Sequence, residues 1–167
     1  KAADIRRIAR KVNQLSPGTI IRLGGMTDCF QPCEQEQRVT YHTILEMNRR
    51  RVGYLIVTKS ALIAEPEYLE ILDRSLAHIQ ITVTCLDDKK TLTYEKASPP
   101  SQRVLAIQKL QESGFDVSMR LSPVIEEFMD FEMLNSLDIE RCVVEFLRIN
   151  TWIRQWLKEV DFTKYSL

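Results

Sequence analysis

The chain has 167 residues, of which 44% are hydrophobic and 28% are charged, and 23 basic residues balance 23 acidic ones. This composition excludes an intrinsically disordered chain, and a chain of this length can bury roughly two-thirds of its surface. No run approaches the roughly 18 apolar residues of a membrane span. Zero net charge does not exclude a nucleic-acid partner, but the chain lacks the basic excess that supports such binding.

Short β-rich runs alternate with longer helical runs along the chain. Apolar spacing and turn residues predict, in chain order, a helix at 2–15, a strand at 19–23, a helix at 34–51, a strand at 54–58 and a helix at 65–72. A strand at 78–84, a helix between Pro100 and Gly114, a strand at 117–121, a helix at 131–137, a strand at 142–147 and a helix at 150–157 follow. Such alternation is typical of a parallel sheet with helical crossovers.

Length limits how much of a barrel this pattern can form. One βα unit occupies about 30 residues here, whereas a full eight-unit barrel needs on the order of 250 residues. We therefore predict an α/β fold: a partial TIM-like barrel of parallel strands with helices outside, about five βα units, forming one domain over residues 1–167. A doubly wound open sheet is the alternative. Because the chain opens on a helix, a strand and its loop are expected upstream of Lys1.

Polar side chains alternate with apolar ones along several predicted strands, and successive side chains on a strand point to opposite faces. The apolar faces are expected to meet helices, so the polar faces should line the barrel interior. Charged groups in an interior are costly unless they pair or contact a polar ligand. Two interpretations stay open: a structural pair of Arg22 and Glu145 with Arg120 nearby, or an interior that accepts a charged ligand. The predicted interior residues are Arg22, Gln80, Thr82, Thr84, Ser118, Arg120 and Glu145.

The carboxyl ends of the predicted strands carry the candidate binding residues, because ligands of parallel α/β folds bind at that edge. Gly24 and Gly25 allow close approach of the backbone, and the Lys59 ammonium suits a carboxylate or phosphate. Thr82 and Thr84 can hydrogen-bond ribose hydroxyls or satisfy one another.

Cysteine and histidine spacing gives no metal-site prediction. The chain has four cysteines and no leader segment, so they are interpreted as thiols of a reducing compartment, and a cytoplasmic location is expected. Cys29 and Cys33 have the spacing of half an iron–sulfur ligand set, but Glu36 occupies the next ligand position. A third interpretation is a metal-dependent hydrolase that uses Asp28, Asp87 and Glu145. It ranks last, because the sequence offers no histidine ligand set to accompany these carboxylates.

Five ordered stretches together resemble the radical S-adenosylmethionine (SAM) superfamily, in the branch of spore photoproduct lyase and photolyase-like proteins. They appear in the family's order between about residues 19 and 150. The stretches are Gly24-Gly25-Met26-Thr27-Asp28, Val57-Thr58-Lys59-Ser60, Ile81-Thr82-Val83-Thr84, Tyr94-Glu95-Lys96-Ala97-Ser98-Pro99 with Arg103, and Arg120-Leu121-Ser122-Pro123.

The resemblance implies an iron–sulfur enzyme that reductively cleaves SAM to a 5′-deoxyadenosyl radical, which abstracts hydrogen from a substrate. Lys59 would hold the SAM carboxylate, Thr82 and Thr84 the ribose, and the pair Glu95 and Arg103 would shape the site. The implied cofactors are SAM and a four-iron–four-sulfur cluster, whose chemistry the protein positions. The implied cofactor contacts are Gly24, Gly25, Thr27, Lys59, Thr82, Thr84 and Arg120.

Two departures from the family qualify this implication. The three-cysteine cluster motif is expected upstream of the first helix, so this chain alone is expected to be inactive. No metal ligand and no catalytic residue are assigned within the chain. Met26 and not cysteine precedes Thr27, so thymine-dimer repair is not expected and the substrate stays open. The implied electron donor is a protein such as a flavodoxin or ferredoxin. The alternative is a non-catalytic α/β interaction module with a structural polar interior.

Overall fold

A computed structural model describes residues 3–165, so Ala2, where the first predicted helix begins, lies outside the described residues. Five parallel strands form one sheet in the order β1-β2-β3-β4-β5. Each strand pairs with its neighbour in the chain, without the order reversal of a doubly wound sheet. The predicted partial barrel is therefore confirmed, and the doubly wound alternative is wrong. The strands are β1 (Ile20–Leu23), β2 (Gly53–Thr58), β3 (Ala77–Thr82), β4 (Asp116–Val124) and β5 (Cys142–Phe146).

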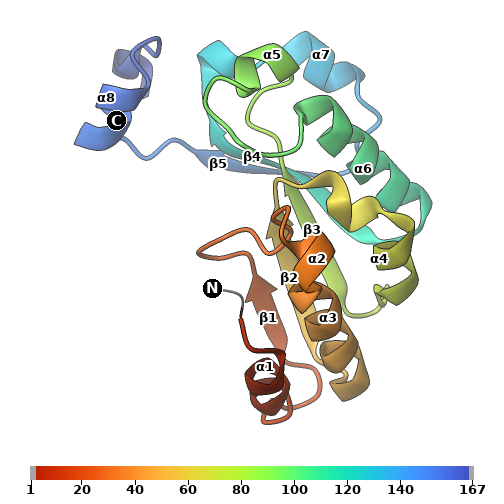
Figure 1. Cartoon of the computed structure of the whole chain (residues 1–167). Helices are drawn as coiled ribbons and strands as arrows, with labels where there is room; N and C mark the ends of the chain where they lie inside the picture. The colour runs from red at the N-terminus through yellow and green to blue at the C-terminus, as the bar shows by residue number, and fades with distance from the viewer. Residues whose placement is uncertain (1–2, 166–167) are drawn as a thin grey trace.

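Helices connect the strands and cover one face of the sheet, where Figure 1 shows α3, α4 and α6 side by side. The α-helices are α1 (Ile5–Val12), α2 (Glu34–Gln37), α3 (Val39–Arg50), α4 (Pro66–Ile71), α5 (Asp88–Thr91), α6 (Pro100–Glu112), α7 (Phe131–Ser136) and α8 (Thr151–Trp156). Short 3-10 turns are η1 (Ala61–Ala64), η2 (Glu126–Phe128) and η3 (Phe162–Tyr165).

The single helix predicted at 34–51 is wrong, because the chain breaks at Arg38, whose backbone is left-handed with φ 54°. The buried carboxylate of Glu34 explains the break. It accepts hydrogen bonds from the backbone N–H groups of Thr40 at 2.9 Å and Tyr41 at 2.8 Å, in the first turn of α3. It also accepts a bond from the Tyr68 hydroxyl at 2.9 Å. The Glu34 side chain therefore caps the N-terminus of α3 and links α3 to α4 through Tyr68.

The apolar alternation on the strands meets the helices as predicted. Ile56, Ile81 and Met119 are fully buried between the sheet and the helical layer. Ile21 and Leu23 of β1 pack against the same core. The polar positions of the strands consequently lie on the opposite side, which we call the concave face.

The concave face carries an ion pair across β4 and β5. Arg120 pairs with Glu145 and donates a 3.0 Å hydrogen bond to the Gln80 amide oxygen on β3, and Ser122 also donates to Glu145. A pair of Glu145 with Arg22, one of the two interpretations left open by the sequence, does not form, because Arg22 is exposed on β1, the opposite edge strand. Hydrogen bonding to Ser122 and the charge of Arg120 lower the pKa of Glu145.

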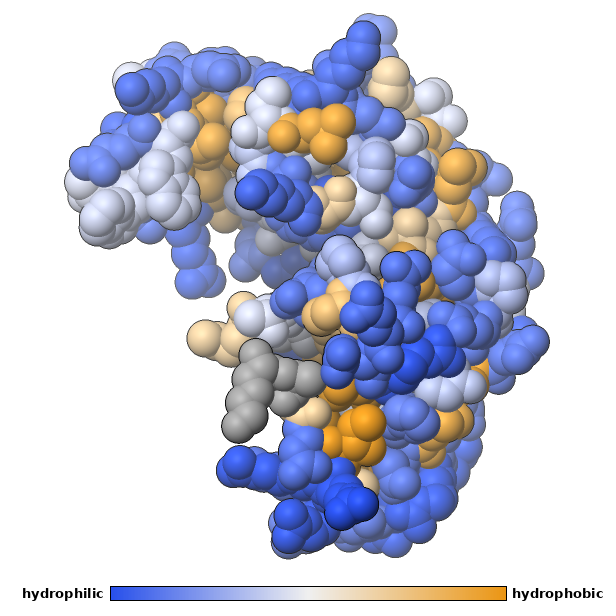
Figure 2. Space-filling view, in the orientation of Figure 1, coloured by the Kyte–Doolittle hydropathy of each residue, from blue (hydrophilic) through white to orange (hydrophobic). Residues whose placement is uncertain are grey.

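The sheet does not close into a full barrel, and β1 and β5 are its two edges. Figure 2 shows a deep notch between the lobe that carries α8 and the lobe that carries α1. Within residues 3–165, no helix is both long enough and apolar enough to cross a membrane.

Candidate functional site

A small hollow of about 210 Å³ lies at the carboxyl ends of β1, β2 and β3. Ligands of parallel α/β folds bind at this edge of the sheet. Four of the seven predicted cofactor contacts line the hollow: Gly24, Thr27, Lys59 and Thr82. The rest of its wall is formed by Met26, Asp28, Val57 and Thr58.

The other three predicted contacts, Gly25, Thr84 and Arg120, lie outside this hollow. A Cβ added at Gly25 would lie 4.0 Å from Arg22 Nε, an ordinary van der Waals distance, so this position does not require glycine for space. Thr84 is buried two residues beyond β3, and its hydroxyl donates to Glu95 at 2.9 Å. Arg120 takes part in the concave-face ion pair. The structure thus does not bring all seven residues to one surface.

Gly24 is required by the backbone itself. Its φ of +82° lies in the left-handed region, and an added Cβ would lie 2.2 Å from the Val57 carbonyl oxygen. The loop after β1 therefore passes directly against the end of β2, which a side chain at position 24 would prevent.

Asp28 fixes the relative position of the first two strand ends. Its carboxylate accepts hydrogen bonds from the Thr58 hydroxyl at 2.8 and 2.9 Å and from the Lys59 backbone N–H at 2.7 Å. It also accepts a 2.9 Å bond from the Phe30 backbone N–H in its own loop. The sequence places Asp28 in the first stretch of the family resemblance and among the carboxylates of the hydrolase alternative, but its role in joining two strand ends was not predicted. Asp28 and Glu145 belong to separate networks.

Lys59 belongs to a charged network that continues into the interior. Its ammonium pairs with Glu95, which lies in the segment between α5 and α6. The other carboxylate oxygen of Glu95 accepts a 2.7 Å bond from Arg103 on α6. Arg103 is fully buried and donates further bonds to the backbone oxygens of Ser98 at 2.6 Å and Thr82 at 3.0 Å. The network connects the ends of β2 and β3 to α6.

Glu95 is held as a carboxylate by its neighbours. Burial alone raises the pKa of Glu95, but the hydrogen bond and charge of Lys59, together with Arg103, outweigh burial and lower it. A lowered folded-state pKa contributes stability that is present above the unfolded-state pKa and is lost as the pH falls through the folded-state value.

We therefore expect the free energy of unfolding of the wild-type chain to fall more steeply below about pH 4.5 than that of Glu95→Gln. Denaturant unfolding between about pH 3 and pH 7 measures both slopes. The glutamine variant should start from a lower stability, so the slopes are compared and not the absolute values. Parallel curves for the two proteins would show that Glu95 titrates identically in the folded and unfolded chains.

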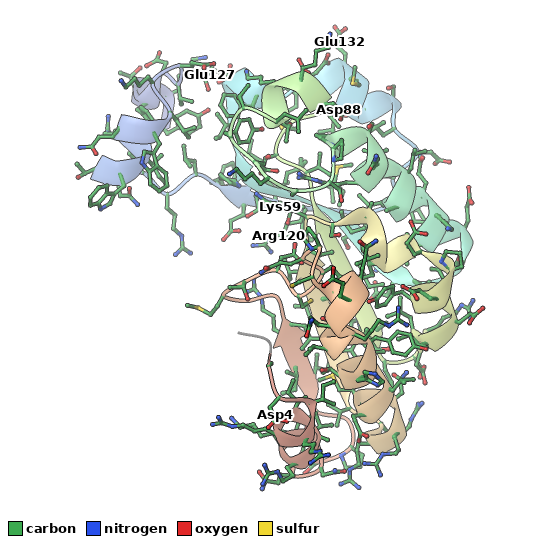
Figure 3. All side chains as sticks on the ribbon, viewed as in Figure 1. Asp4, Lys59, Asp88, Arg120, Glu127 and Glu132 are labelled. Carbon is green, nitrogen blue, oxygen red and sulfur yellow. The ribbon has the colours of Figure 1, made fainter. Side chains whose placement is uncertain are left out.

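A larger cleft of about 890 Å³ shares Asp28 and Lys59 with the small hollow. Its volume lies within the range of small-molecule sites. Lys59 therefore forms part of the wall of both spaces. Figure 3 shows Lys59 at the centre of the molecule, near the level of Arg120 in that view. The cleft is bounded by residues of the segments 28–35, 59–65 and 94–102.

The described residues do not fit an iron–sulfur cluster. Among residues 3–165, no three His, Cys, Asp or Glu side chains gather as a metal site. Burial, with the nearby charge of Asp28, raises the pKa of the Cys29 thiol to about 12, whereas cluster ligands are thiolates. The chain's residues 3–165 are therefore assigned no cluster chemistry.

The small hollow, at about 210 Å³, lies below the volume range of small-molecule sites, but its groups suit the carboxylate and hydroxyl part of an organic ligand. Lys59 supplies a cation that is 37% exposed, whereas its partner Glu95 is 8% exposed. Thr27 and Thr82 place two hydroxyl-bearing side chains on the same wall. A cation and hydroxyls on one concave surface can fix the orientation of such a ligand.

Comparisons with known proteins give a likeness of fold. No family model and no curated protein sequence matches the chain. A solved variant of spore photoproduct lyase with dinucleoside spore photoproduct has a TM-score of 0.65 and 13% identity, over 96% of this chain and 53% of that chain. A second variant, with bound AdoMet and dinucleoside spore photoproduct, has a TM-score of 0.63 at the same identity and coverage.

The chain thus spans about half the length of these spore photoproduct lyases. The predicted resemblance to spore photoproduct lyase is confirmed at the level of the fold, an open sheet of parallel strands with helices around it.

Proposed function

We propose that this chain forms the SAM-binding part of a radical SAM enzyme. The observation that carries the proposal is the convergence of Gly24, Thr27, Lys59 and Thr82 on one hollow at the carboxyl edge of the sheet. The fold likeness supports it, because one similar structure contains AdoMet.

Each lining residue has a role that follows from its chemistry. Lys59 binds the SAM carboxylate, since an ammonium is a compact partner for that anion. Gly24 and Thr27 contact the methionine end, and the Thr82 hydroxyl binds a ribose hydroxyl. Thr84, whose hydroxyl already donates to Glu95, supports the network and does not contact the ribose.

SAM held by Gly24, Thr27, Lys59 and Thr82 would supply hydrogen-atom abstraction from a substrate after one-electron reduction by an external donor. The described residues that line the hollow bind and orient the molecule. An electron-donor protein such as a flavodoxin or ferredoxin is part of the proposal, and the substrate is left unassigned.

Titration of SAM into the full chain tests the proposal. Isothermal titration calorimetry should show binding of one SAM per chain. Thr82→Val should weaken it about fivefold, the value of one lost neutral hydrogen bond. Thr93→Val is the matched control, because the Thr93 hydroxyl is exposed and bonds the Lys90 carbonyl oxygen outside the hollow. A wild-type chain that binds no SAM would contradict the proposal and favour the non-catalytic interaction module with a structural concave face.

A further inference from the structure

We propose that Glu95 is a positioning residue that holds the Lys59 ammonium ready for a ligand carboxylate. The inference rests on the proposed function of the small hollow and assigns a role that the lining residues alone do not show. It follows from two features of the Lys59–Glu95–Arg103 network: its gradient of exposure and its connection to Thr82.

Exposure decreases from Lys59 through Glu95 to Arg103, whose side chains are 37%, 8% and 0% exposed. Glu95 accepts bonds from all three surrounding donors, Lys59, Thr84 and Arg103, so its carboxylate is fixed on both oxygens. The Lys59 backbone is held separately by Asp28. Of the three charged side chains, that of Lys59 is the most exposed, and Lys59 lines both cavities whereas Glu95 lines the larger one alone.

The charges around Lys59 balance before a ligand binds. Lys59 and Arg103 carry two positive charges, and Glu95 and Asp28, which bonds the Lys59 backbone and lines the same hollow, carry two negative charges. Arg103 is fully buried and donates to Glu95 and to two backbone oxygens. A ligand carboxylate thus meets an ammonium that is already oriented. Ordering a long side chain before binding reduces the entropy lost on binding.

The same network fixes a second ligand contact. Arg103 donates a 3.0 Å bond to the backbone oxygen of Thr82, whose side chain lines the hollow. Glu95 therefore links the position of Lys59, which directly follows β2, to the position of Thr82 on β3, through Arg103. We therefore expect a substitution at Glu95 to disturb the position of Lys59 and so to weaken binding of the ligand carboxylate.

The test compares SAM with decarboxylated SAM, which lacks only the carboxylate. Both are titrated by calorimetry into the full chain as wild type, Glu95→Gln and Glu95→Asp. Glu67→Gln is the matched control, since Glu67 on α4 forms an ion pair with Arg38 away from the hollow. Wild type should prefer SAM, and Glu95→Gln should reduce this preference about tenfold with little change for decarboxylated SAM. Glu95→Asp should reduce it about threefold, and Glu67→Gln should leave it unchanged.

Glu95→Asp retains a negative charge beside Arg103, so it provides the test if Glu95→Gln does not fold. An unchanged preference in a folded Glu95 variant would overturn the positioning role while SAM binding by wild type still supports the proposed function. Tighter SAM binding by Glu95→Gln would also overturn it, because Glu95 would then compete with the ligand for Lys59. A wild-type chain that binds neither ligand would overturn the proposed function itself.

Discussion

Replacement of Arg103 by methionine is expected to lower the free energy of unfolding by about 3–5 kcal/mol, the cost of breaking a buried ion pair from one side. Arg103 is fully buried, and its guanidinium bonds Glu95 and the backbone oxygens of Ser98 and Thr82. Methionine fills much of the same volume but leaves these acceptors without their donor. Urea unfolding of the two proteins at neutral pH measures the difference.

Arg51→Met is the matched control for this substitution. Arg51 pairs with Asp73 at 2.8 Å, but its side chain is 59% exposed. An exposed ion pair contributes at most about 1 kcal/mol, so the control should remain close to wild type. Equal stability losses in the two variants would mean that burial of Arg103 adds nothing to its ion pair.

Replacement of Lys59 by methionine is expected to weaken SAM binding about 10–100-fold, the value of one hydrogen bond to a charged group. The folded state should persist, because Glu95 keeps its bonds to Arg103 and Thr84. The variant should also bind SAM and decarboxylated SAM almost equally, since the group that distinguishes them is gone. Calorimetric titration of both molecules measures these changes.

Lys109→Met provides the control for removal of a lysine charge, because Lys109 is exposed on α6 outside both cavities. It should bind SAM as wild type does. If Lys59→Met retained the wild-type affinity, the carboxylate would have to be bound elsewhere, and the assignment of Lys59 would be wrong.

Strand positions and the partial barrel were predictable because they depend on local alternation. Ile56 and Ile81 alternate with polar or half-buried neighbours, and the structure buries both. The break at Arg38 was not predictable from helical periodicity. It depends on the Glu34 carboxylate, which bonds the N–H groups of α3 and the Tyr68 hydroxyl 34 residues away.

The four lining residues of the hollow were predictable because parallel strands end at the same edge of the sheet. The ionic partner of Lys59 was not predictable from the strand pattern. Lys59 and Glu95 are 36 residues apart, and Glu95 lies well beyond the end of β3. Similarly, the strand pattern placed Arg22, Arg120 and Glu145 on one face, but strand order decides that Glu145 meets Arg120.

The notch left by the open sheet has a dielectric consequence for the concave face. Water has access to Glu145, whose side chain is 42% exposed, so its attraction to Arg120 is screened and the charges keep part of their hydration. The open sheet therefore tolerates the Arg120–Glu145 ion pair, which a closed, dry barrel would not. Any molecule that covers this face would displace that water and strengthen the field between the two side chains.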